Sequence, residues 1–208
     1  MTTKSALLEL VDNVSVPFEQ ARAMPPSVYT SPQFLDLEVN NIFAREWFSL
    51  GRSSVLGKPG DYVTFELAGQ PLFVMRGRDG RLQAMSNVCL HRMSTLLEGT
   101  GNRSAIVCPY HGWTYNIDGT LRGVPAMQQN AGFCKANYRL PEIRCEDWLG
   151  WIMVTLNADA PPVGEQLAEV ESHIADYGMA GYIETFRETH VWDTNWKILA
   201  ENFMESYH

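Results

Sequence analysis

Two short motifs, each with one cysteine and one histidine, contain the residues of this chain best suited to chemistry. Cys89 and His91 are separated by one residue, Cys108 and His111 by two, and sixteen residues lie between the two pairs. Thiolate sulfur and imidazole nitrogen are ligands that zinc and iron–sulfur clusters prefer. The two motifs therefore predict a metal centre built from two separate loops.

The spacing distinguishes the two kinds of metal centre. Structural zinc sites usually take two cysteines from one segment and two histidines from another. Here each segment supplies one of each, which fits two irons, one bound by both cysteines and the other by both histidines. That is the arrangement of a Rieske [2Fe–2S] cluster, in which the histidines raise the reduction potential. A structural zinc module that binds a partner, and a chance group of buried thiols and histidines, stay open as alternatives.

The sequence around the motifs is typical of a small antiparallel sandwich or barrel. Short apolar runs are bounded by turn signals such as Asp118-Gly119, which favours a hairpin. Several short strands at this spacing indicate an all-β module. The expected strands cover residues 62–67, 71–75, 81–87, 105–108, 113–117 and 148–156.

Helices are expected on both sides of this module. Ser31-Pro32 is a typical helix start, and apolar residues follow at helical spacing, which predicts a helix ending near Trp47-Phe48. The Pro-rich stretch 159–164 is the best candidate for a domain boundary. The segments expected after it are a helix over 165–177, a strand over 186–192 and a helix over 195–208.

Composition limits the class of protein. The chain has 208 residues, 45% of them hydrophobic and 19% charged, with a net charge of −8. These values indicate a globular protein and disfavour a nucleic-acid binder, which needs a basic surface. No apolar run is long enough to span a membrane, and acidic residues interrupt the N-terminal apolar stretch, so we expect neither a membrane span nor a signal peptide. Four cysteines are too few for a disulfide scaffold, which favours the cytoplasm.

The residues around the motifs extend the pattern. His91-Arg92, Cys108-Pro109-Tyr110-His111-Gly112-Trp113 and Asp118-Gly119 resemble the Rieske signature of ring-hydroxylating and related oxygenase α subunits. The resemblance implies that residues 45–158 form a Rieske domain, preceded by an N-terminal lead-in and helix over 1–44. It also implies that Cys89, His91, Cys108 and His111 bind the [2Fe–2S] cluster.

The C-terminal segment resembles the start of the catalytic domain of the same family. Asn195-Trp196-Lys197 and Glu201-Asn202 are followed by Glu205, Tyr207 and His208. The resemblance implies that His208 is a ligand of a mononuclear Fe(II), that Glu205 bridges this iron and the cluster of a neighbouring subunit, and that Asn202 lies near the iron. It implies an overall α+β fold, in which residues 159–208 begin a helix-grip-type catalytic domain whose remaining iron ligands lie beyond His208.

Function and partners follow from the resemblance. It implies a terminal oxygenase that uses O₂ to hydroxylate or oxidatively demethylate an aromatic or quaternary-ammonium small molecule. Glu205 stands where many aromatic-ring dioxygenases have aspartate, which resembles the carnitine and betaine branch. Electrons are expected from NAD(P)H through a separate reductase, with or without a ferredoxin, to a cytoplasmic homotrimer of the full-length chain. A Rieske-type electron-transfer ferredoxin is the alternative.

The remaining candidate residues are interpreted as structural. We expect Cys134 and Cys145 to be buried free thiols, His173 to lie on the surface and His190 to have a structural role. The acidic excess of the chain is interpreted as an aid to solubility and to docking of the reductase or ferredoxin.

Overall fold

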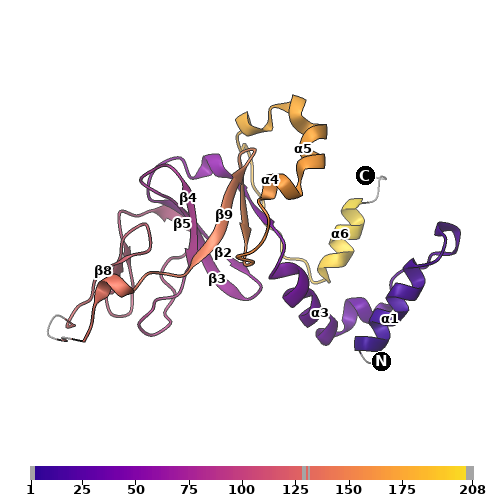
Figure 1. Ribbon diagram of the computed structural model, residues 1–208, viewed down its shortest axis with the longest axis horizontal. Helices are drawn as coiled ribbons and strands as arrows, with labels where there is room; N and C mark the ends of the chain where they lie inside the picture. The colour runs from indigo at the N-terminus through magenta and orange to yellow at the C-terminus, as the bar shows by residue number, and fades with distance from the viewer. Residues whose placement is uncertain (1–2, 128–129, 131, 205–208) are drawn as a thin grey trace. The chain divides into compact units, whose positions relative to one another are not determined.

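The computed structural model describes residues 3–127, 130 and 132–204, and the chain divides into two compact units. One unit comprises residues 44–185 and contains both sheets (Figure 1). The other combines residues 1–43 with residues 186–208, so the two ends of the chain belong to one unit. The functional division into residues 1–44, 45–158 and 159–208 stays a prediction.

Antiparallel strands build the larger unit. A seven-stranded sheet has the order β1-β10-β9-β4-β3-β2-β5, and a three-stranded sheet has the order β6-β7-β8. This arrangement confirms the expected antiparallel β module. The strands are β1 (Phe48–Arg52), β2 (Asp61–Leu67), β3 (Gln70–Arg76), β4 (Leu82–Ser86), β5 (Thr100–Asn102), β6 (Ile106–Val107), β7 (Thr114–Tyr115), β8 (Leu121–Gly123), β9 (Glu142–Trp148) and β10 (Trp151–Thr155).

Strand β3 separates two hydrophobic cores. Side chains alternate across a strand, so Leu72 and Val74 point to one face while Phe73 and Met75 point to the other. All four are at most 1% exposed. The Phe73 face packs with residues of the three-stranded sheet, including Tyr115, so the two sheets enclose a core that also contains both motif cysteines. The second core joins β3 to β10.

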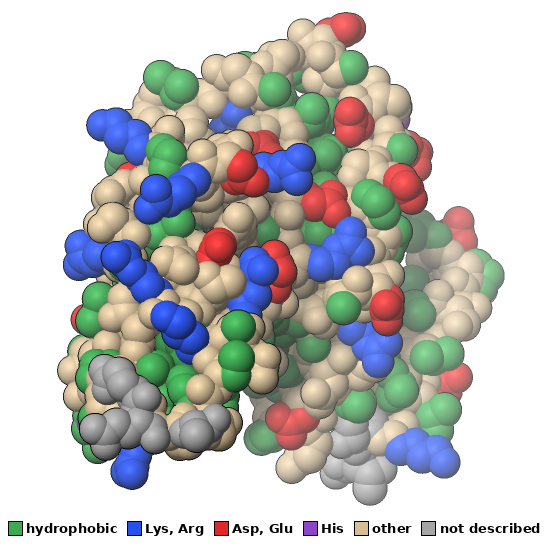
Figure 2. All heavy atoms as spheres, turned by 60° about the vertical axis from the view of Figure 1, so that its left-hand side comes forward, with side chains coloured by type: hydrophobic (Ala, Val, Ile, Leu, Met, Phe, Trp, Pro, Cys, Tyr) green, Lys and Arg blue, Asp and Glu red, His purple; other side chains and the backbone are tan. Residues whose placement is uncertain are grey.

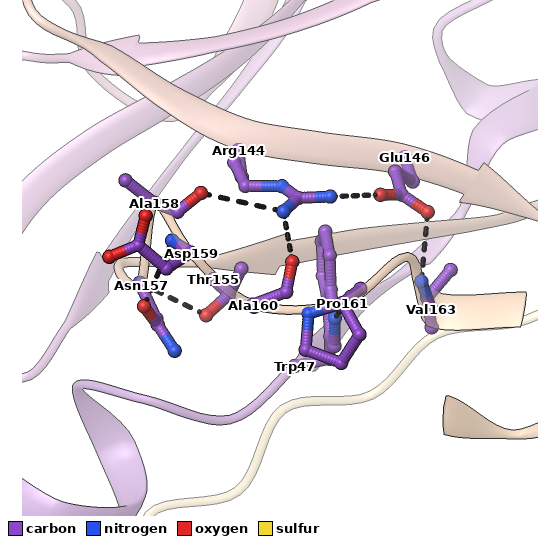
Figure 3. A network of polar contacts seen from close by, with 10 residues as sticks. All are labelled: Trp47, Arg144, Glu146, Thr155, Asn157, Ala158, Asp159, Ala160, Pro161 and Val163. Carbon is purple, nitrogen blue, oxygen red and sulfur yellow. Dashed lines mark hydrogen bonds and ion pairs between the residues drawn. The ribbon is translucent and has the colours of Figure 1, made fainter. Parts of the chain in front are cut away.

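Hydrogen bonds hold the loop after β10 against strand β9. The Arg144 guanidinium donates hydrogen bonds to the carbonyls of Ala158 and Ala160 and to Glu146, which accepts from the backbone N–H of Val163 (Figure 3). Two helices follow, α4 (Val163–Gln166) and α5 (Ala168–Ile174). The predicted boundary at 159–164 is therefore a bound segment within this unit.

Helices build the smaller unit. They are α1 (Thr3–Val14), α2 (Pro26–Thr30), α3 (Pro32–Glu38) and α6 (Trp196–Met204), with a π-helical turn, η2 (Val39–Phe43), after α3. Ser31 caps α3 as predicted, because its hydroxyl accepts from the N–H of Phe34 at 3.3 Å. A buried ion pair joins α3 to α6: Lys197 Nζ lies 2.7 Å from Glu38 Oε1.

Several expectations about the elements are wrong. The helix that begins after Ser31 does not reach Trp47: it ends in the π-helical turn at Phe43, and β1 begins at Phe48. Residues 186–192 form no strand but an irregular segment. Strand β9 was not predicted, although its charged residues alternate with the inward-facing Ile143 and Cys145 as they do in a half-buried strand. None of the described helices is long and apolar enough to cross a membrane.

Candidate metal centre

The two motifs occupy tight turns at the end of the β domain. The first turn follows β4, where the N–H of Cys89 donates to the carbonyl of Ser94 at 2.9 Å. The second joins β6 to β7, where the N–H of Cys108 donates to the carbonyl of Trp113 at 2.8 Å. Gly112 takes a φ of +72°, which other residues rarely adopt, so its N–H reaches the carbonyl of Cys108 at 3.0 Å.

The two thiols lie side by side in the core. Cys89 is 0% and Cys108 3% exposed, and the Cys89 thiol hydrogen-bonds to Cys108. Burial raises the pKa of Cys108, but hydrogen bonds from the backbone N–H groups of Tyr110 and His111 and from the side chains of Cys89 and Ser94 outweigh it, so the net shift is downward. A cradle of N–H donors around a sulfur favours the thiolate, the form that binds metal.

The two imidazoles face each other at the surface. The ring centroids of His91 and His111 are 4.8 Å apart, and the planes meet at 68°. Both residues are exposed. Desolvation, and then the charges of His91 and Arg92, lower the pKa of His111, which favours the neutral ring that a metal requires. The four motif residues thus form a buried thiol pair beside an exposed imidazole pair.

Aromatic rings fix the orientation of both imidazoles. Trp113 stacks on His91 with centroids 4.9 Å apart and planes within 4°. Tyr110 stacks on His111 at 3.7 Å. Phe133 and Tyr138 in turn contact Trp113 edge-on, at 5.7 and 6.1 Å. Trp113 is buried, whereas Tyr110 is exposed.

Tyr115 is a residue of this site that sequence reasoning missed. Its hydroxyl lies 3.3 Å from the sulfur of Cys89 and accepts a hydrogen bond from the N–H of Leu90 at 3.0 Å. Burial and the hydrogen bond to Cys89 raise the pKa of Tyr115, so the hydroxyl keeps its proton and can donate it to the sulfur. The available signal was the alternation of Trp113, Tyr115 and Ile117, which points all three side chains into the core.

The other candidate residues lie elsewhere. Asn202 is exposed on α6 of the smaller unit, while Glu205 and His208 lie outside the described residues. Cys134 is exposed, so the expectation of a buried thiol is wrong there; it lies in a loop beside a 3₁₀ turn. Cys145 is half-buried, and its desolvation raises the pKa of its thiol to about 12.

The two histidines outside the motifs are both at the surface. His173 is exposed, as expected. His190 is exposed as well, and its Nε2 lies 3.0 Å from the carboxylate of Glu188.

Comparison with known families defines the class of this centre. Residues 46–144 match the family described as the Rieske [2Fe-2S] domain, and this match includes all four motif residues. The β module is therefore a Rieske domain, and a Rieske domain implies a [2Fe–2S] cluster.

Similarity to known proteins extends beyond this domain. The carnitine monooxygenase oxygenase subunit of Acinetobacter baumannii is 32% identical over 98% of this chain and 56% of its own length. The glycine betaine monooxygenase oxygenase subunit of Pseudomonas aeruginosa is 30% identical over 89% of this chain and 43% of its own length. The crystal structure of the apo form of the quaternary ammonium Rieske monooxygenase CntA matches with a TM-score of 0.84 and 31% identity, over 90% of this chain and 56% of that one.

The chain therefore contains a Rieske domain and resembles Rieske oxygenase subunits of the quaternary-ammonium branch over most of its length. It spans about half the length of the curated relatives it matches.

Proposed function

We propose that Cys89 and Cys108 bind one iron of the cluster and that His91 and His111 bind the other. The observation that carries this assignment is the separation of the donors into a buried thiol pair and an exposed imidazole pair. A structural zinc ion needs its four donors around a single point. Among the residues that the structure describes, no three His, Cys, Asp or Glu side chains are grouped in that way.

The donor set fits the cluster chemically. When bound, the cluster stores one electron at a time, at a potential that its two histidine ligands raise. The chain's own contribution is to desolvate the thiols, supply N–H donors to Cys108 and keep both imidazoles at the surface. Trp113 and Tyr110 fix the ring planes of His91 and His111, so these two ligands are already oriented for metal binding.

Tyr115→Phe is expected to lower the reduction potential of the cluster by about 20–60 mV. When Cys89 is a metal-bound thiolate, only the Tyr115 hydroxyl can donate in this contact, and the bond would stabilise the reduced, more negative state. A hydrogen bond contributes about 0.5–1.5 kcal/mol, and about 59 mV corresponds to 1.4 kcal/mol for one electron. A redox titration followed by visible absorbance measures the shift. Tyr138→Phe is the control, because Tyr138 packs on Trp113; equal potentials in all three proteins contradict the role.

We further propose that the whole protein is a terminal oxygenase acting on a quaternary ammonium compound. The relatives are named carnitine and glycine betaine monooxygenase subunits, and their similarity covers 98% and 89% of this chain, which is much more than the Rieske domain that a simple electron carrier needs. In this proposal, His208 is a ligand of a mononuclear iron, Glu205 joins that iron's histidine to a cluster histidine of a neighbouring subunit, and Asn202 lies near the iron. A carboxylate between two imidazoles orients both.

The proposed partners follow from the same similarity. Electrons come from an NAD(P)H-dependent reductase, directly or through a ferredoxin, and O₂ and the small-molecule substrate are consumed by a cytoplasmic homotrimer. One solved Rieske monooxygenase of this branch is described as revealing inter-subunit electron transfer. In a closed head-to-tail ring, the cluster of each subunit can lie beside the mononuclear iron of the next subunit.

Glu205→Gln tests this function in the whole protein. Oxygen uptake is measured with carnitine, glycine betaine and choline in the presence of a reductase. We expect the variant to keep its cluster absorbance and to lose at least about 10- to 100-fold in uptake, because an outer-shell ligand of both metal sites is gone. Glu188→Gln, an exposed carboxylate, is the matched control. Full uptake by the Glu205 variant excludes the bridging role, and no uptake by the unmodified protein excludes the oxygenase.

A further inference from the structure

Two segments of this chain, which has a net charge of −8, carry net charges of opposite sign. Residues 46–144 carry 11 Lys and Arg against 7 Asp and Glu, a net charge of +4, whereas residues 145–208 carry 2 against 12, a net charge of −10. Figure 2 shows Lys and Arg side chains gathered on the left-hand side of the view. The Rieske domain is thus basic within an acidic chain. The acidic excess therefore lies outside the domain at which a reductase would deliver electrons.

A basic groove lies on the Rieske domain. It encloses about 440 Å³, and its apolar lining includes Val124, Met127 and Phe133. Arg122 and Lys135 line it as well, both are exposed, and Lys135 Nζ donates to the carbonyl of Arg122 at 3.2 Å. No acidic side chain is among its lining residues in the described part of the chain. We call this depression the Phe133 groove.

Ring contacts connect the Phe133 groove to the metal centre. Phe133 meets Trp113 edge-on with centroids 5.7 Å apart. Trp113 stacks on His91 at 4.9 Å. A protein seated in the groove therefore lies two ring contacts from a proposed cluster ligand. The lack of acidic lining residues separates the groove from other depressions of the Rieske domain that contain an arginine, such as one lined by Arg78, Asp79 and Asp118 and one lined by Arg103 and Glu98.

We propose that the Phe133 groove docks an acidic, ferredoxin-type [2Fe–2S] protein that supplies electrons to the Rieske domain. The inference rests on the proposed cluster ligands. One electron leaves the reduced centre of the donor, which is oxidised by one electron, and the Rieske centre is reduced by one; no proton or atom is transferred. An apolar centre flanked by two cations suits a transient partner of opposite charge, because complementary charge raises the rate of encounter.

Charge reversal in the groove tests the proposal. The variant is Arg122→Glu/Lys135→Glu, and the control is Arg78→Glu/Arg81→Glu, which makes the same charge change at exposed arginines of the β3–β4 turn. A plant-type [2Fe–2S] ferredoxin, reduced beforehand, is mixed with each oxidised protein in a stopped-flow instrument at several salt concentrations. We expect the groove variant to be reduced at least about 10-fold more slowly at low salt and the control less than about 3-fold. The rate of reduction should fall with rising salt in the unmodified protein and in the control. In the groove variant the rate should depend less on salt.

Reduction by dithionite separates failure of the docking surface from failure of the proposed function. If all three proteins hold a cluster that dithionite reduces equally, a slow reaction with ferredoxin in the groove variant alone supports the proposal. Equal slowing in both charge-reversed proteins overturns the groove and leaves the cluster assignment intact. A groove variant that changes oligomeric state in size-exclusion chromatography shows that a second copy occupies the groove, which also overturns the proposal. Absence of a cluster from the unmodified protein overturns the proposed ligands instead.

Discussion

Replacing Cys108 by alanine is expected to abolish the iron–sulfur cluster. Cys108 is one of the two proposed sulfur ligands, and its thiol is 3% exposed beside Cys89. With one of the two thiolates gone, its iron keeps only Cys89 as a protein ligand, and this thiol is buried where water does not readily replace the lost sulfur. We therefore expect the two irons and two sulfides of the cluster to fall to about zero per chain, as measured by iron and acid-labile sulfide assays and by visible absorbance.

Cys134→Ala is the matched control for Cys108→Ala. It also removes a free thiol, but Cys134 is exposed and lies outside both motif turns, so cluster content should be unchanged. Far-UV circular dichroism of both variants shows whether the β domain has folded. A folded Cys108 variant that retains both irons and both sulfides contradicts the ligand assignment. One equivalent of zinc in the unmodified protein, without sulfide, favours the structural zinc alternative.

Lys197→Met is expected to destabilise the docking of helix α6 by about 3–5 kcal/mol. The substitution leaves the carboxylate of Glu38, whose side chain is 6% exposed, without its ammonium partner. An unpaired buried charge costs that amount because the protein interior solvates it poorly. Trp196 also donates to Glu38, at 3.1 Å, but one indole N–H does not neutralise a carboxylate. Hydrogen exchange of the amides of residues 196–204 measures the free energy of local opening directly.

Two further variants separate the buried ion pair from a general effect of removing a cation. Glu38→Leu/Lys197→Met removes both charges and should recover most of the lost protection, since a buried pair contributes little beyond its apolar replacement. Arg139→Met breaks an exposed contact of 3.9 Å with Glu142 and should cost less than about 1 kcal/mol. If the double variant is as unstable as Lys197→Met, the unpaired charge of Glu38 is not the cause of the instability, and the prediction is contradicted.

The β domain and the motif turns were predictable because their signals are local. Strands β2 and β3 match the expected runs at 62–67 and 71–75, and Gly119 takes a φ of +84° in the turn that Asp118-Gly119 predicted. The alternation of side chains in a strand, and the glycine that a turn with positive φ requires, can both be recognised from residues adjacent in the sequence.

Other elements were missed because their stability depends on distant partners. Strand β1 forms by pairing with β10, with Phe48 opposite Val154, and the preceding helix stops at Phe43 to permit it. Residues 186–192 resemble a strand in composition, but they belong to neither of the two sheets in the described part of the chain and stay irregular. A run of strand-forming residues needs a neighbouring edge before it becomes a strand.

The sequence by itself determined the chemistry: which side chains are thiols and imidazoles, and that each turn supplies one of each. The tertiary structure decided what surrounds them. Folding placed the Tyr115 hydroxyl 3.3 Å from Cys89, stacked Trp113 on His91, and gathered Arg122 and Lys135 around Phe133. Ligand identity is carried by residue type and spacing along the chain, whereas the hydrogen bonds, rings and charges around a metal centre come from strands far apart in sequence, which only the packed sheets bring together.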